Sequence, residues 1–208
     1  EVFSEFATYG IAEDTASHHQ VNSIFYQKNK FTVISSSGFW LSEKPHIVGS
    51  KSWDSNCVRF ANWVHLKDKT SGKEFRVINT HLDHLGQSAR ENQAKIIVEE
   101  SSAFAMEFPQ ILTGDMNCDA NNKAIHIFKD GGWVDTFSLV HGPKDPGNTY
   151  HGFIGPKYIV PENDMTKGKM DWIFIRGNCK AVEAEVIREE ENGRFPSDHY
   201  FVSATVNL

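Results

Sequence analysis

The sequence predicts an α+β fold in which two mainly antiparallel β-sheets pack together and helices flank them. Two observations carry this prediction: strand-like and helix-like segments are mixed along all 208 residues, and strand-like segments recur as hairpins. A purely parallel, doubly wound sheet does not fit, because the hairpin signals are too frequent. One domain is expected at this length, and we assign residues 1–208 to it.

Apolar alternation and short apolar runs identify the strands. The predicted strands cover residues 21–27, 31–42, 58–67, 74–82, 110–113, 170–176, 182–188 and 200–207. The turn KTSGK at residues 69–73 joins two of them into a hairpin over residues 58–82.

Two segments have helical patterns. Residues 88–106 place apolar side chains on one face, with Ser88 as the expected N-cap and Glu91 positioned to complete a capping box. Residues 122–129 form a shorter helix that the glycines at 131 and 132 end.

The composition limits the classes of function. Lys and Arg number 21 against 27 Asp and Glu, for a net charge of −6, which disfavours binding to nucleic acid through non-specific phosphate attraction. No apolar run approaches the roughly 18 residues that a membrane span needs. The separated cysteines Cys57, Cys118 and Cys179 predict neither a disulfide framework nor a CxxC metal site, so we expect small core residues.

Asp, Asn and His residues follow several predicted strands. They occur in the segments NTHLDH at 79–84, GDMN at 114–117, MDW at 170–172 and SDH at 197–199. Side chains at strand ends on one edge of a sheet can converge although they are far apart in the sequence. We therefore expect one polar cleft lined by His81, Asp115, Asn117, Asp171, Asp198 and His199.

The residue types suggest the chemistry of this cleft. Asp115 and Asn117 point the same way in an extended chain and suit a hydrated hard cation with a phosphoryl oxygen, although a turn after a strand explains them equally well. Asp171 lies in an apolar strand, where a carboxylate needs a partner, and a histidine oriented as in a catalytic triad is expected. Asp198 can hold a cation while His199 faces a substrate; a capping or turn role is the alternative.

A zinc site is a second interpretation of part of this pattern. His81, Asp83 and His84 form H-x-D-H, which resembles part of the H-x-H-x-D-H zinc motif of metallo-β-lactamases. Asn79 stands where the first histidine of that motif belongs, and zinc needs several N or S ligands.

The segment Gly142–Gly168 is rich in Gly and Pro and is long for a plain connection, which makes it a candidate functional loop. We expect it to border the cleft and set specificity. In this hypothesis the aromatic rings, Phe153 among them, pack against a sugar or base while His151 reaches the phosphate. A solvated crossover is the alternative.

Taken together, the motifs resemble the endonuclease/exonuclease/phosphatase superfamily, which has the deoxyribonuclease I fold. The resemblance rests on Glu-Val at the start, NTHLDH, LTGDMN, MDWIF and SDHY, in that order, and it runs through nearly the whole chain. FWLS at 39–42 and TYHGF at 149–153 are similar to the bacterial metal-dependent hydrolase branch. The resemblance implies a four-layer α/β/β/α sandwich and a Mg²⁺-dependent phosphoesterase, with Mn²⁺ as an alternative ion.

The resemblance also implies a role for each site residue. Glu1 and Asp198 bind the metal, Asp115 and Asn117 orient the attacking water and bind the scissile phosphate, and His81 lies on the leaving-group side. Asp171 orients the catalytic His199, and Arg59 lies near the phosphate. His151 and Phe153, from the candidate functional loop at 142–168, are the expected substrate contacts.

The sequence departs from the family at its start. Family members begin with a strand that carries a catalytic Asn, then a helix, then a strand that ends in Gln-Glu, whereas this sequence opens at that Glu. We therefore expect the N-terminal strands to be missing and the natural protein to be longer. A groove or exposed strand edge is expected beside Val77–His81 or Ile111–Gly114.

The expected substrate is a phosphomonoester or phosphodiester: a small phosphorylated metabolite, a lipid headgroup or, less favoured by the charge, a nucleic acid. A phosphate-binding module of the same fold without turnover is the alternative from another class. The bacterial resemblance favours the cytoplasm, and secretion stays open, as does the oligomeric state.

Overall fold

The structure is a computed structural model that describes residues 4–11, 22–161 and 167–208. Its centre is a six-stranded sheet in the order β3-β4-β5-β6-β8-β7. The strands are β3 (Phe31–Trp40), β4 (Phe60–Asp68), β5 (Glu74–His81), β6 (Gln110–Asp115), β8 (Asp171–Arg176) and β7 (Val134–Asp135). β5 and β6 run parallel and the other neighbours run antiparallel.

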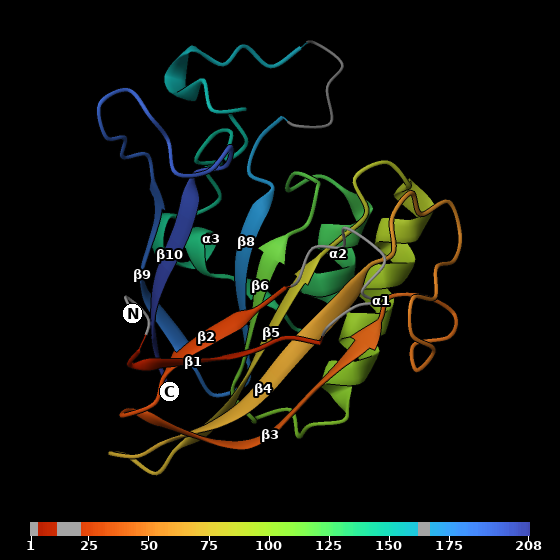
Figure 1. Ribbon diagram of the computed structural model, residues 1–208, viewed down its shortest axis with the longest axis vertical. Coiled ribbons are helices and arrows are strands. Elements are labelled where there is room, and N and C mark those ends of the chain that lie inside the picture. The colour runs from red at the N-terminus through yellow and green to blue at the C-terminus, as the bar shows by residue number, and fades with distance from the viewer. Residues whose placement is uncertain (1–3, 12–21, 162–166) are drawn as a thin grey trace.

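Two antiparallel strand pairs form a second layer on one face of this sheet (Figure 1). The pair β1 (Phe6–Tyr9) and β2 (Ile24–Gln27) contacts β4, and the pair β9 (Lys180–Ile187) and β10 (Phe201–Asn207) contacts β8 through β10. The packed α+β sandwich that the sequence predicts is confirmed, with strand pairs in place of one continuous second sheet among the described residues.

Helices α1 (Gln87–Ser102) and α2 (Lys123–Asp130) cover the opposite face of the central sheet, and α3 (Thr136–His141) packs on β9 (Figure 1). The short strands β1 and β7, helix α3 and a 3₁₀ turn at Gly155–Lys157 carry no clear sequence pattern and were not predicted. No helix in the described part of the chain is both long enough and apolar enough to cross a membrane.

The period-two alternation of β5, β6 and β8 divides their side chains between two cores. Ile78, Leu112 and Phe174 join the core under α1 and α2, whereas Phe75 and Ile111 join the core under the β1–β2 pair. By the same alternation His81 and Asp115 lie on the face toward the second layer. The strand pattern therefore places the polar strand ends between the two sheet layers.

Helix α1 begins differently from the prediction. Its N-cap is Gly86 without a side-chain cap, and Ser88 is exposed. The N–H groups of Ser88 and Ala89 donate instead to the carboxylate of Asp54, at 3.3 Å and 2.6 Å. A carboxylate from a distant loop has taken the role of the local cap, and the helix ends at Ser102 rather than at residue 106.

We expect Asp54→Ala to lower the free energy of unfolding by about 1 kcal/mol, because it removes the acceptor at the start of α1. Ser88→Ala is the matched control and should change stability by less than about 0.5 kcal/mol. Urea unfolding of the two variants measures the difference. A larger loss of unfolding free energy in Ser88→Ala than in Asp54→Ala would show that Ser88 caps α1, as the sequence predicts.

Candidate functional site

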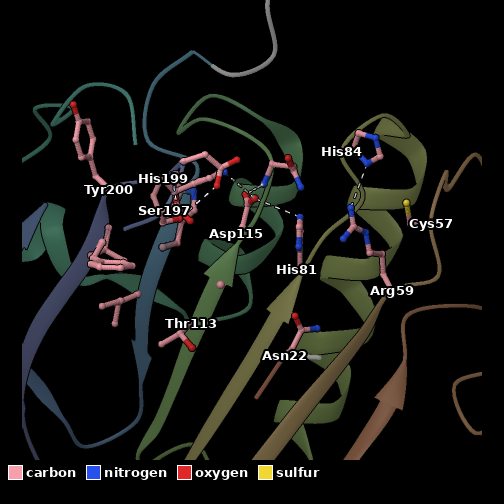
Figure 2. A pocket seen from close by; sticks show the side chains of 18 of the residues that line it. Asn22, Cys57, Arg59, His81, His84, Thr113, Asp115, Ser197, His199 and Tyr200 are labelled. Atoms are coloured by element: carbon pink, nitrogen blue, oxygen red, sulfur yellow. Dashed lines mark hydrogen bonds and ion pairs between the residues drawn. The ribbon is translucent and has the colours of Figure 1, made fainter. Parts of the chain in front are cut away.

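A cavity of about 780 Å³ opens where the ends of β5, β6 and β8 meet the start of β10. The side chains predicted to share a cleft all line it: His81, Asp115, Asn117, Asp171, Asp198 and His199. Arg59, His84 and Cys57 line it too. These residues come from five separate sequence segments, which meet at one end of the sandwich (Figure 2). Glu1, the other expected metal ligand, lies outside the described residues.

Strand register places three of these residues in a row. His81 is opposite Asp115 in the parallel pair β5–β6, and Asp115 is opposite Asp171 in the antiparallel pair β6–β8. Gly114 permits the close approach of β5 and β6, since a Cβ there would lie 2.0 Å from the carbonyl oxygen of Thr80. Close packing of β5 and β6 therefore explains why a glycine precedes Asp115.

His199 and Asp171 form a hydrogen-bonded dyad. The His199 Nδ1 lies 2.8 Å from the Asp171 Oδ2. Burial disfavours the charged imidazole, but the hydrogen bond and the charge of Asp171, with the nearby carboxylates, outweigh it and raise the pKa of His199 to about 8. The expected histidine partner of Asp171 is thus in place, and it is charged at neutral pH.

The carboxylate of Asp115 lies between two imidazoles (Figure 2). Its Oδ2 is 3.4 Å from the His81 Nε2 and 3.9 Å from the His199 Nε2. Burial and the charge of Asp171 raise the pKa of Asp115 to about 6. Burial, assisted by the positive charges of Arg59 and His199, lowers the pKa of His81 to about 3, so its contact with Asp115 joins a neutral imidazole to a carboxylate.

Asn117 does not extend beside Asp115 as predicted. It adopts a left-handed backbone conformation with φ of 50°, and its N–H donates to the Asp115 Oδ1 at 2.8 Å. Its side-chain Nδ2 donates to the carbonyl of Leu82 at 2.9 Å. The turn brings Asn117 to the cavity wall and also ties the end of β6 to the end of β5.

Asp83 is a buried structural carboxylate. One oxygen accepts from the Ser55 hydroxyl and from the N–H groups of Asn56 and Cys57, at 2.9–3.0 Å. The other accepts from the N–H groups of Leu85 and Gly86, at 3.0 Å and 2.8 Å. Burial opposes ionisation, but these donors outweigh it and lower the pKa of Asp83 to about 2.

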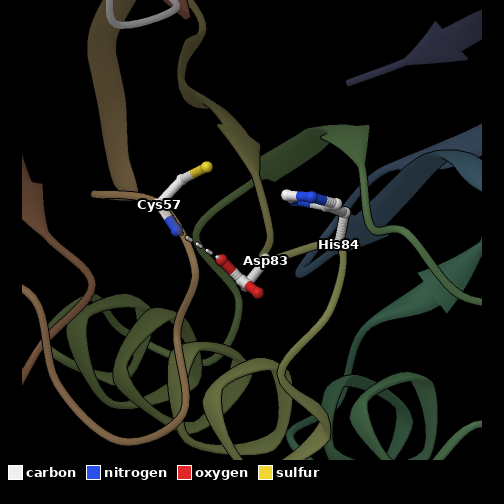
Figure 3. Close-up of side chains that lie close together, drawn as sticks. All are labelled: Cys57, Asp83 and His84. Atoms are coloured by element: carbon white, nitrogen blue, oxygen red, sulfur yellow. Dashed lines mark hydrogen bonds between the residues drawn. The ribbon is translucent and has the colours of Figure 1, made fainter. Parts of the chain in front are cut away.

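The H-x-D-H segment therefore does not converge on a zinc ion. His81 faces Asp115, the Asp83 oxygens accept from backbone N–H groups and the Ser55 hydroxyl, and the His84 Nδ1 accepts from the Arg59 Nη2 at 3.3 Å. Ligand atoms of Cys57, Asp83 and His84 do come within 4.8 Å of one another (Figure 3). The resident cation there is the Arg59 guanidinium, whose Nε is 3.9 Å from the Asp83 carboxylate.

His151 and Phe153 correct the prediction of substrate contacts. His151 is 1% exposed and packs against the rings of Phe195 and Tyr200, while its Nδ1 accepts from the Gly155 N–H at 3.2 Å. Phe153 is 61% exposed, and neither side chain lines the cavity. Residues 149–155 fold back on themselves, so their alternation does not present these side chains to the site.

The same segment reaches the site in another way. The Tyr150 ring meets the His199 ring edge-on with centroids 5.1 Å apart. The N–H groups of His151 and Gly152 donate to the carbonyl of Asp198 at 2.8 Å and 3.1 Å. Tyr150, His151 and Gly152 thus contact Asp198 and His199 without lining the cavity themselves.

Thr113 is a cavity residue that the sequence pattern indicates only weakly. Thr113 lines the cavity one pleat below Asp115, and its hydroxyl donates to Asn79 at 2.9 Å. Cys118 is buried as expected, with a pKa that burial raises to about 12, whereas Cys57 and Cys179 are half-buried. Asn79 and Thr113 are polar residues that lie two positions before His81 and Asp115, and therefore on the same face of β5 and β6. This pattern is what indicates them in the sequence.

The cavity carboxylates fit a hard divalent cation, whereas His199, charged and bonded to Asp171, does not act as a ligand. Ligand atoms of Asp115, Asp171 and His199 lie within 4.8 Å of one another, and Asp198 lines the same cavity outside this tight group. Carboxylate oxygens are the ligands that Mg²⁺ prefers. A divalent charge would offset the repulsion between Asp115 and Asp171 that raises the pKa of Asp115.

We expect Asp83→Asn to lower the free energy of unfolding at pH 7 by about 3 kcal/mol, because an amide nitrogen cannot accept from the converging donors. Relative to its ordinary value of 3.8, the lowered pKa of Asp83 stabilises the fold by about 2 kcal/mol above pH 4, and this is lost as the pH falls toward 2. Urea unfolding at both ends of this range measures the loss. Asp68→Asn, at the end of β4 where the carboxylate accepts from the exposed turn at Thr70 and Ser71, is the control; an equal effect would contradict the structural role of Asp83.

Solved structures share this fold. A crystal structure of an endonuclease/exonuclease/phosphatase from Bacteroides vulgatus matches with a TM-score of 0.85 at 30% identity, over 98% of this chain and 77% of that one. A mannosyl-6-phosphatase from Bacteroides thetaiotaomicron matches with a TM-score of 0.82 at 28% identity, over 99% and 78%. The human Nocturnin catalytic domain shares the fold at 16% identity and a TM-score of 0.66, over 97% and 73%. No protein-family model and no curated protein matches the sequence.

Proposed function

The chain belongs to the endonuclease/exonuclease/phosphatase family, and we propose that it hydrolyses a phosphate ester in the cavity, with Mg²⁺ as its metal and Mn²⁺ as an alternative. The observation that carries the proposal is the row of His81, Asp115 and Asp171, with His199 bonded to its end. It joins a buried carboxylate, a charged imidazole and a neutral imidazole at one point. In-line attack of water on a phosphoryl group needs these kinds of group.

In this proposal Asp115, His199 and His81 each have a separate role. Asp115 orients the attacking water and accepts its proton, since a pKa of about 6 makes it more basic than an ordinary aspartate. His199, held by Asp171, donates from Nε2 to a phosphoryl oxygen. His81 is neutral and donates a hydrogen bond, not a proton, on the leaving-group side.

Arg59 supplies a fixed positive charge in the cavity wall, where it is 8% exposed. Asp198 is the proposed metal ligand, and Glu1 is expected to join it. When bound, Mg²⁺ neutralises negative charge that develops on the phosphoryl oxygens. The water oxygen attacks phosphorus, the bond to the leaving oxygen breaks, and that oxygen takes up a proton from solvent.

The proposed substrate class is a phosphomonoester of a small metabolite, with a sugar phosphate as the first candidate. Two observations support it: the 28% identical relative is a mannosyl-6-phosphatase, and the net charge of −6 is unfavourable for a polyanion. Release of inorganic phosphate from a panel of sugar phosphates, nucleotides, lipid headgroups and DNA tests this choice. Binding of these ligands without turnover would favour a binding module.

We expect His199→Gln to lower kcat by about 10²–10⁴-fold, because it removes the charged donor at the phosphoryl group. Asp171→Asn should lower kcat less, by about 10–100-fold, because it removes only the group that orients His199. His126→Gln, on the exposed face of α2, is the matched control. Steady-state kinetics measure all three variants, and turnover near wild type in His199→Gln would remove this residue from the mechanism.

Removal of divalent ions by a chelator should abolish phosphate release, and added Mg²⁺ or Mn²⁺ should restore it, because the cavity carboxylates need a compensating charge. Asp198→Asn should raise the Mg²⁺ concentration required for half-maximal activity by about 10-fold or more. Full activity after exhaustive chelation, checked by metal analysis, would contradict the proposed metal dependence.

A further inference from the structure

Thr149 is a buried residue that lies behind the catalytic dyad. It is 0% exposed and lies in the segment between α3 and β8, next to Tyr150, whose ring meets His199. Its backbone N–H donates to the carbonyl of Gly168 at 3.3 Å. All hydrogen bonds described for Thr149 go to residues 168–171, which include Asp171, or to Tyr200, which follows His199.

One set of contacts holds Asp171. The Thr149 Oγ1 accepts from the N–H of Met170 at 2.9 Å and from the N–H of Asp171 at 3.2 Å. Asp171 is the first residue of β8, where the regular ladder begins. The hydroxyl therefore fixes the backbone from which the Asp171 carboxylate extends toward His199.

A second set of contacts fixes the segment that carries His199, the partner of Asp171. The carbonyl of Thr149 accepts from the N–H of Tyr200 at 2.8 Å, and Tyr150 and His199 form an isolated antiparallel bridge. Residues 149–150 thus pair with residues 199–200. One threonine is bonded to both chain segments whose side chains meet at 2.8 Å in the dyad.

We propose that Thr149 is a positioning residue that sets the distance between the Asp171 carboxylate and the His199 imidazole. The proposal rests on the proposed hydrolase function, since only there does the dyad have a catalytic role. A hydroxyl is needed because the N–H groups of Met170 and Asp171 converge on one buried acceptor, and both would lose their hydrogen bond without it. A methyl group at that position would move Met170 and Asp171 away from the segment at 149–150.

Thr149→Val removes the acceptor and keeps the side-chain shape. We expect it to lower kcat by about 10–100-fold with KM changed by less than about 3-fold, because a displaced positioning group acts on the transition state. Thr149→Ser keeps the acceptor and should return kcat to within about 3-fold of wild type. Should Thr149→Val not fold by circular dichroism, Thr149→Ala makes the same comparison with a smaller side chain.

Thr136→Val is the matched control. Thr136 is 2% exposed, and its hydroxyl also bonds the backbone of β8, at the carbonyl of Ile173 with a distance of 2.8 Å. The Thr136→Val variant also loses a hydrogen bond between a buried threonine and β8, one that the hydroxyl donates, and the bond that is lost does not involve Asp171. An equal fall of kcat in Thr136→Val and Thr149→Val would show a general loss of stability and overturn the proposal.

A double-mutant cycle and a spectrum complete the test. In the Asp171→Ala background Thr149→Val should cost no further activity; full additivity would contradict action through Asp171. The downfield proton resonance of the His199 Nδ1–H, assigned by its loss in Asp171→Ala, should shift upfield in Thr149→Val and stay in Thr149→Ser. This spectrum needs no turnover, so an unchanged resonance overturns the positioning role, whereas a shifted resonance in an inactive protein leaves it intact and counts against the hydrolase function alone.

Discussion

The pairing register of β6 with its two neighbours is the constraint on which the site depends. It sets His81, Asp115 and Asp171 side by side on the face toward the second layer. A slip of one residue would turn Asp115 into the core under α1 and α2, where Leu112 and Phe174 pack, and would bring apolar side chains to the cavity. The two hydrophobic cores oppose such a slip, so the packing that stabilises the sandwich also aligns His81, Asp115 and Asp171.

The two imidazoles beside Asp115 differ in charge, and the difference follows from their burial and from the charged groups next to each of them. His81 and His199 are both near Asp115, yet burial beside Arg59 keeps His81 neutral while the bond to Asp171 keeps His199 charged. Asp83 holds its own charge through backbone donors and so keeps a counter-charge beside Arg59 without entering the cavity chemistry. One site therefore contains a buried carboxylate, a neutral imidazole and a charged imidazole, all built from ordinary side chains.

Much of the fold and of the site could be predicted from the sequence, because strand alternation and strand ends are local patterns. The convergence of His81 and Asp115 follows from their places at the ends of neighbouring strands. The misses have non-local or backbone causes. Asp54 caps α1 from a remote loop, Asn117 turns back in a left-handed conformation, and His151 is buried by rings that come from residues 195 and 200.

The described residues of the segment at 142–168 meet the site differently from the sequence expectation. The sequence predicts substrate contacts from His151 and Phe153, yet the first side chain is buried, the second is exposed, and neither lines the cavity. What reaches the site is backbone from residues 149–152 and the hydroxyl of Thr149, all bonded to the segments around Asp171 and Asp198. Backbone contacts of this kind tolerate many side chains. Among the described residues, Cys57, Arg59 and His84 line the cavity from other segments, and they line it with their side chains rather than through backbone contacts to the loop.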